Sequence, residues 1–114
     1  MCRLGASESI PSWATQGGFF CVVRGIDELS IVAPENLVPN DVRCELGWIA
    51  LKLEGPFPFS MTGVLASFLQ HLGDARISIF AVSTFDTDYV LIKREQLERA
   101  QDALAAAGHD RISV

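Results

Sequence analysis

Residues 55–63 read GPFPFSMTG and separate two strongly patterned segments of the chain. Before them, Trp48–Leu53 reads as a strand, and after them Val64–Leu72 has the apolar spacing of an amphipathic helix. The two prolines exclude regular structure from the stretch, and Ser60 and Thr62 stand where the N-cap of the helix is expected. Because the first N–H groups of a helix have no partner inside it, they can bind an anion. We therefore interpret residues 55–63 as one wall of a small-molecule pocket.

The pattern that follows the predicted helix indicates the fold class. Ile77–Ser83 and Tyr89–Lys93 read as strands joined by a turn, Glu95–Ala107 reads as a second amphipathic helix, and Arg111–Val114 would be a last strand. Gly73 is expected to end the first helix. The order strand, helix, strand, strand, helix, strand predicts an α+β protein with a ferredoxin-like βαββαβ fold, in which both helices cover one face of an antiparallel sheet.

An internal repeat relates the two halves of the chain. A shift of sixty positions places the predicted hairpin Phe19–Ala33 on the predicted hairpin Ile79–Lys93 without a gap. We interpret residues 1–46 as a degenerate copy of the unit formed by residues 47–114. Each half alone is too small to bury a good core, so we expect the two to pack together.

A second candidate stretch for the site, the polar sequence STFDTD at residues 83–88, occupies the turn between two predicted strands. Asp, Thr and Ser favour turns, so a plain turn is an equally good interpretation when the stretch is considered alone. In a ferredoxin-like sheet, however, the end of the first strand faces this turn, so residues 55–63 and 83–88 are expected to converge. Helix-start donors would hold a carboxylate, and Asp86 or Asp88 would hold an ammonium or guanidinium group. Apolar cover would come from Phe59, Met61 and Phe85. This combination suits a free amino acid.

Charge and hydropathy exclude several classes of partner. The chain has nine basic and fourteen acidic residues, and its largest basic cluster is Lys93-Arg94, so we expect no nucleic-acid partner. No signal-peptide pattern follows Met1, and no apolar run approaches the roughly twenty residues that span a bilayer. We expect a cytoplasmic protein that does not insert into a membrane.

The nucleophilic and metal-ligating residue types form no recognisable set. Cys2, Cys21 and Cys44 lack metal-ligand spacing, and Cys21 lies in an apolar run that favours a small buried hydrophobe. His71 and His109 have no partner at a usable spacing. Asp86 and Asp88 could be the acid–base pair of a glycosidase, but the chain has little room for the groove that such an enzyme needs. A Ca²⁺ or Mg²⁺ loop usually has more oxygen ligands at regular spacing. No nucleophile–base–acid set is visible. We therefore predict no enzyme activity, no metal and no cofactor.

Three runs of the sequence can be taken together: residues 53–66, residues 79–91 and the earlier run Glu28–Val32. They resemble ACT-domain proteins of the CASTOR type, and the resemblance covers nearly the whole chain. It implies a tandem βαββαβ fold, amino-acid binding at an interface between ACT units, and no catalysis. In the arginine sensor of this family, the ligand is held by the loop entering the first helix and by the hairpin turn. The matching positions here are Phe59, Ser60, Met61, Thr62, Gly63, Leu65, Thr84, Phe85 and Asp88. The sensor has an acidic residue where this chain has Met61.

Two classes of function follow as hypotheses. The first is a non-catalytic regulatory or sensor module that binds a free amino acid and forms a homodimer through sheet or helix faces. The alternative is a protein–protein module that regulates an enzyme of amino-acid metabolism, such as an aspartate kinase, in trans and without binding a ligand itself.

Overall fold

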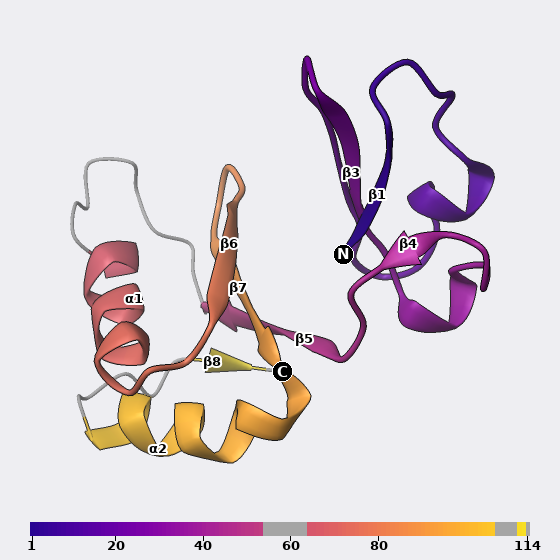
Figure 1. The fold of residues 1–114 in the computed structure, drawn as a ribbon. Helices are drawn as coiled ribbons and strands as arrows, with labels where there is room; N and C mark the ends of the chain where they lie inside the picture. The colour runs from indigo at the N-terminus through magenta and orange to yellow at the C-terminus, as the bar shows by residue number, and fades with distance from the viewer. Residues whose placement is uncertain (54–63, 107–111, 114) are drawn as a thin grey trace. The chain divides into compact units, whose positions relative to one another are not determined.

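The computed structural model describes residues 1–53, 64–106 and 112–113 (Figure 1). The chain divides into an N-terminal unit, Met1–Gly47, and a C-terminal unit, Trp48–Val114. Each unit contains one four-stranded sheet whose neighbouring strands are antiparallel. Within the described residues the two α-helices both belong to the C-terminal unit. The predicted α+β class is confirmed.

The C-terminal unit has the predicted order of elements. These are β5 (Trp48–Leu53), α1 (Val64–Asp74), β6 (Ile79–Ser83), β7 (Asp88–Lys93), the 3-10 turn η3 (Arg94–Gln96), α2 (Leu97–Ala106) and β8 (Ile112–Ser113). The strands lie in the order β6-β7-β5-β8, and β6 and β7 form a hairpin, coloured orange in Figure 1. Neither α1 nor α2, nor any other helix of the described ranges, is long and apolar enough to cross a bilayer.

Alternation along β5 decides which face of this sheet is buried. Leu51 and Leu53 join the core, whereas Trp48, Ala50 and Lys52 lie on the opposite face. The helices meet the core face with the residues that their spacing predicts. From α1 these are Phe68 and Leu72, with Leu65 and Leu69 packed beside them, and from α2 they are Ala100 and Leu104, with Leu97 packed beside them. Both helices therefore cover the same face of the sheet, as predicted.

The end of α1 differs from the prediction. Gly73 is still helical, since α1 continues to Asp74, and the left-handed residue is Arg76, with a φ of 60°. The Arg99 Nη2 donates to the carbonyl oxygens of Ala75 and Arg76 at 2.6 and 3.0 Å. The backbone closes the last turn of the helix, since Arg76 N donates to Gly73 O at 2.9 Å, and Arg99 binds the two carbonyl groups that follow the helix.

The N-terminal unit has four strands, as the C-terminal unit has, but 3-10 turns in place of the α-helices. Its elements are β1 (Cys2–Gly5), the 3-10 turn η1 (Ser12–Thr15), β2 (Cys21–Arg24), β3 (Glu28–Val32), the 3-10 turn η2 (Glu35–Leu37) and β4 (Arg43–Cys44). The strands lie in the order β2-β3-β1-β4, which matches the order in the C-terminal sheet when β1 is equated with β5 and β4 with β8. The two-residue strand β4 was not predicted from the sequence.

The repeat offset of sixty is wrong by one residue in the hairpins. Gly25 N donates to Glu28 O in the first hairpin, and Thr84 N donates to Thr87 O in the second, so equivalent turn positions are 59 apart. Side chains alternate between the two faces of a strand, and the core residues are odd-numbered in β3 but even-numbered in β7. An even offset would therefore match core positions of one strand with outward positions of the other. With 59, the core residue Ile31 falls on the core residue Val90.

The N-terminal core is small and includes a disulfide. Its buried residues are Cys2, Ala14, Leu29 and Ile31, and Cys2 is bonded to Cys44. The two cysteines are direct cross-strand partners on β1 and β4, a pairing that their sequence separation of 42 residues did not reveal. Cys21, predicted to be a buried hydrophobe, is a free cysteine that is only half-buried, because β2 is an edge strand of the sheet.

Candidate functional site

The turn between β6 and β7 is closed by two threonines. Thr84 N donates to Thr87 O at 2.8 Å, and the Thr84 hydroxyl donates to the same oxygen at 2.9 Å. Thr87 N returns a bond to the Thr84 hydroxyl at 3.2 Å. Side chain and backbone therefore define the turn together, which holds Phe85 and Asp86 at its tip.

This turn is attached to the end of the strand that precedes residues 54–63. The Thr87 hydroxyl donates to Leu53 O. Asp88 pairs with Leu53 across β5–β7 and with Ser83 across β6–β7, so the three residues form one row on the helix-covered face of the sheet. The end of β5 and the hairpin turn lie side by side, as the topology suggested.

Exposure within the turn is graded. Thr84, Phe85 and Asp86 are exposed, with 78% of Phe85 open to solvent, whereas Asp88 is half-buried. Neither Asp86 nor Asp88 forms a salt bridge with a cation of the described residues. Two carboxylates therefore stand at the end of the sheet with their charge open to a cationic group.

The other predicted site residues divide into two groups. Leu65 packs against the core of the C-terminal unit from the first turn of α1. Five of the predicted site residues lie outside the described residues: Phe59, Ser60, Met61, Thr62 and Gly63. On this side of the turn the structure describes the chain as far as Leu53.

Two residues near the turn were missed as individual site candidates. Thr87 anchors the turn to β5, and Ser83 shares a row with Asp88. Both belong to the stretch 83–88 that the sequence singled out. Only the pairing register reveals that the Thr87 hydroxyl reaches a different strand, since local sequence accounts equally well for a bond within the turn.

The face of the C-terminal sheet without helices is also largely apolar. Trp48 and Phe80 make an edge-to-face contact with ring centroids 4.7 Å apart, and Lys93 Nζ lies 4.7 Å from the Trp48 ring. Leu91 lies between Ala50 and Phe80 in the sheet and is buried. The Trp48 indole N–H is buried and has no hydrogen-bond partner within the described ranges.

Comparison with known proteins agrees with this architecture. A family model for the ACT domain matches residues 43–106, and a second family model, for an N-terminal domain, matches residues 1–41. The crystal structure of protein Atu0741 from Agobacterium tumefaciens is similar, with 48% sequence identity and a TM-score of 0.90 over 95% of this chain and 81% of that chain. A comparison with curated proteins finds no match. Since the ACT model spans more than half of its residues, the chain belongs to the ACT domain family.

Proposed function

We propose that the protein is a non-catalytic ACT-type regulatory or sensor module whose ligand is a free amino acid. In this proposal residues 47–114 form the ligand-binding ferredoxin-like ACT unit, and residues 1–46 are its degenerate copy. The ACT family match supports a small-molecule regulatory role. The equivalent strand orders of the two sheets support the tandem arrangement.

The observation that carries the proposal is the attachment of the hairpin turn to the end of β5. The Thr87 hydroxyl binds Leu53 O, and Leu53 pairs with Asp88. Asp86 and Asp88 thereby stand beside the point where the chain enters residues 54–63. A carboxylate held by a rigid turn suits an ammonium group, because the cost of ordering it has been met before the ligand arrives. The predicted N–H donors of the helix start, where Ser60 and Thr62 are the N-cap candidates, would then receive the ligand carboxylate.

Titration calorimetry against each of the twenty amino acids tests this proposal. We expect heat with at least one of them at about millimolar concentration, and at least about tenfold weaker binding in Asp88→Asn, since a charge-assisted hydrogen bond contributes about 1.5–3 kcal/mol. Asp102→Asn is the matched control, because it removes the same charge from the exposed side of α2. Absence of heat with all twenty amino acids would refute the proposal.

A second candidate function is favoured by the helix-free face of the C-terminal sheet. Trp48 and Phe80 form an apolar surface there beside the buried Leu91, and such a surface suits a protein partner or a second copy of the chain. The partner in this alternative is an enzyme of amino-acid metabolism, such as an aspartate kinase, regulated in trans. Co-purification of the two proteins that is insensitive to amino acids and survives Asp88→Ala would support it. A loss of the complex in Asp88→Ala would favour the ligand-binding proposal instead.

A further inference from the structure

The outer face of the N-terminal sheet carries two arginines side by side. Cys2 and Leu4 belong to the core side of β1, so Arg3 lies on the opposite face. Arg3 is the direct partner of Ser30 on β3 and of Arg43 on β4. One row across the sheet therefore presents a hydroxyl and two guanidinium groups in sequence.

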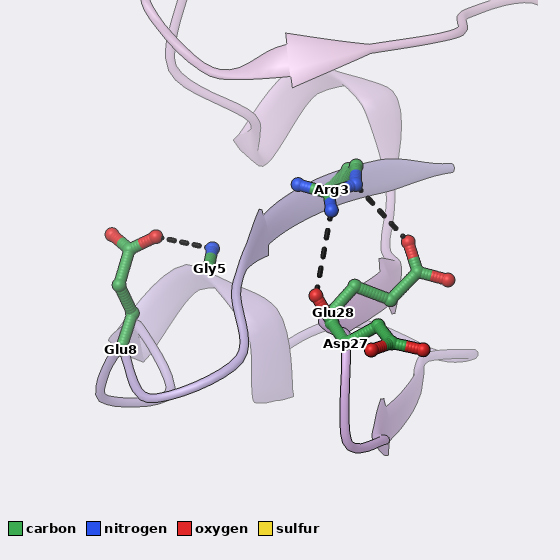
Figure 2. A network of polar contacts seen from close by, with 5 residues as sticks. All are labelled: Arg3, Gly5, Glu8, Asp27 and Glu28. Atoms are coloured by element: carbon green, nitrogen blue, oxygen red, sulfur yellow. Dashed lines mark hydrogen bonds and ion pairs between the residues drawn. The ribbon is translucent and has the colours of Figure 1, made fainter.

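Arg3 is held in a defined orientation by Glu28, the first residue of β3, and by Asp27 directly before it. Its Nε lies 3.2 Å from Glu28 Oε2, and its Nη2 donates to Asp27 O at 3.4 Å, as Figure 2 shows. The remaining nitrogen, Nη1, has no hydrogen bond or ion pair with a described residue. Part of the guanidinium fork is thus anchored, and part is left to bind another acceptor.

Arg43 has no such compensation. It is exposed, and no carboxylate among residues 1–53, 64–106 and 112–113 lies within salt-bridge distance of it. Like charges directly opposite each other on antiparallel strands are destabilising, and Glu28 offsets only Arg3. An anion between the two guanidinium groups would remove this repulsion.

The sheet is hollowed at this place. A hollow of about 430 Å³ has eight lining residues: Met1, Cys2, Arg3, Glu28, Ser30, Arg43, Cys44 and Glu45. This volume falls within the range of small-molecule sites. All the lining residues belong to the N-terminal unit, so no residue of the C-terminal hairpin turn lines the hollow.

The disulfide sets the spacing of the two arginines. Cys2 precedes Arg3 and Cys44 follows Arg43, and the bond between them joins the two strands at the neighbouring row. The positions of the two arginines on the backbone are therefore held by a covalent link as well as by the β1–β4 ladder. Such preorganisation raises the affinity of a polar site, because little order remains to be imposed by the ligand.

We propose that this face binds a small oxyanion, a carboxylate or a phosphate, between the guanidinium groups of Arg3 and Arg43. The planar forks would each offer paired N–H donors to the anion, and the Ser30 hydroxyl would donate from the end of the row. This site is independent of the amino-acid site proposed for the C-terminal unit.

The test uses the full chain and two probes, inorganic phosphate and succinate. Binding is followed by nitrogen-15 NMR of the arginine side chains and by calorimetry at low ionic strength. We expect saturable shifts of the Arg3 and Arg43 Nε–Hε signals with at least one probe, and about tenfold or greater weakening in Arg43→Gln, as expected for loss of a charge-assisted pair. The probe that binds shows whether the site prefers a phosphate or a carboxylate. Arg43→Lys should weaken binding as well, because it keeps the charge and loses the fork.

Arg94→Gln is the matched control, since it removes an exposed guanidinium from the C-terminal unit. Equal weakening in Arg94→Gln and Arg43→Gln would overturn the proposal, as would the absence of saturable shifts with both probes at about 10 mM, a concentration that detects even weak binding. If Arg43→Gln fails to fold, the wild-type signals of Arg3 and Arg43 decide alone. Shifts confined to other arginines would then overturn the site.

Discussion

Reducing the disulfide between Cys2 and Cys44 should destabilise the N-terminal unit far more than the C-terminal unit. The bond closes a loop that spans nearly all of the N-terminal unit, since its two ends are 42 residues apart and the unit ends at Gly47. The core that remains after reduction has few members, because only Cys2, Ala14, Leu29 and Ile31 are buried in it. A unit of this size depends strongly on a covalent link.

The magnitude follows from the length of the closed loop. In the chain-entropy treatment, a link across a loop of this length restricts the unfolded chain by about 4 kcal/mol at 25 °C. The cysteine side chains remain as small apolar groups after reduction, so little packing is lost with the bond. We therefore expect urea unfolding of the N-terminal unit to require about 4 kcal/mol less in the reduced protein than in the oxidised one.

Hydrogen exchange measured by mass spectrometry with and without a phosphine reductant is the assay. Peptides from β1 and β3 should exchange much faster after reduction, whereas peptides from β7 and α1 should change little. Cys21→Ser is the control, because Cys21 is free and its loss leaves the link intact. Two results would refute the reasoning: three titratable thiols in the oxidised protein, or a stability difference below about 1 kcal/mol between the oxidised and reduced forms, well under the predicted entropic contribution.

The remaining predictions concern the C-terminal unit. Phe68→Ala should cost about 3–5 kcal/mol in urea unfolding, since Phe68 is 1% exposed, whereas Phe85→Ala should cost less than about 0.5 kcal/mol; similar costs for both would contradict the described core. Thr87→Val should cost about 1 kcal/mol and speed hydrogen exchange in the hairpin, because Leu53 O loses its donor; unchanged exchange would argue against that bond. Arg76→Gly should raise the melting temperature, since the backbone of Arg76 is in the left-handed conformation, where a side chain costs about 1–2 kcal/mol. A lower melting temperature would show that the arginine side chain stabilises the fold by more than the backbone strain costs.

The C-terminal unit could be predicted well from sequence because its patterns are strong and local. The strand Trp48–Leu53 was predicted with the bounds that it has, and the apolar faces of both helices point as their spacing indicates. Its misses lie at element ends. The strand expected to start at Ile77 starts at Ile79, and the helix stop moved from Gly73 to Arg76. Ends depend on turn-closing hydrogen bonds such as the one from Arg76 N to Gly73 O, which apolar periodicity does not reveal.

The N-terminal unit was predicted less completely because its elements are short. The two-residue strand β4 has no periodicity to detect, and the repeat offset was mistaken by one residue because single-residue similarities do not define which face a strand buries. The oxyanion site went unnoticed for the same reason, since Arg3 and Arg43 are forty positions apart and meet only through the pairing of β1 with β4.

The sequence by itself determined the α+β class, the order of elements in the C-terminal unit and the polar hairpin turn, because hydrophobic periodicity and turn-forming residues act over a few neighbouring positions. The tertiary structure decided what the strands bring together. It pairs Cys2 with Cys44, places Arg3 beside Arg43, and carries the Thr87 hydroxyl to Leu53 O. These contacts join residues tens of positions apart, and register, which depends on the whole sheet, selects them.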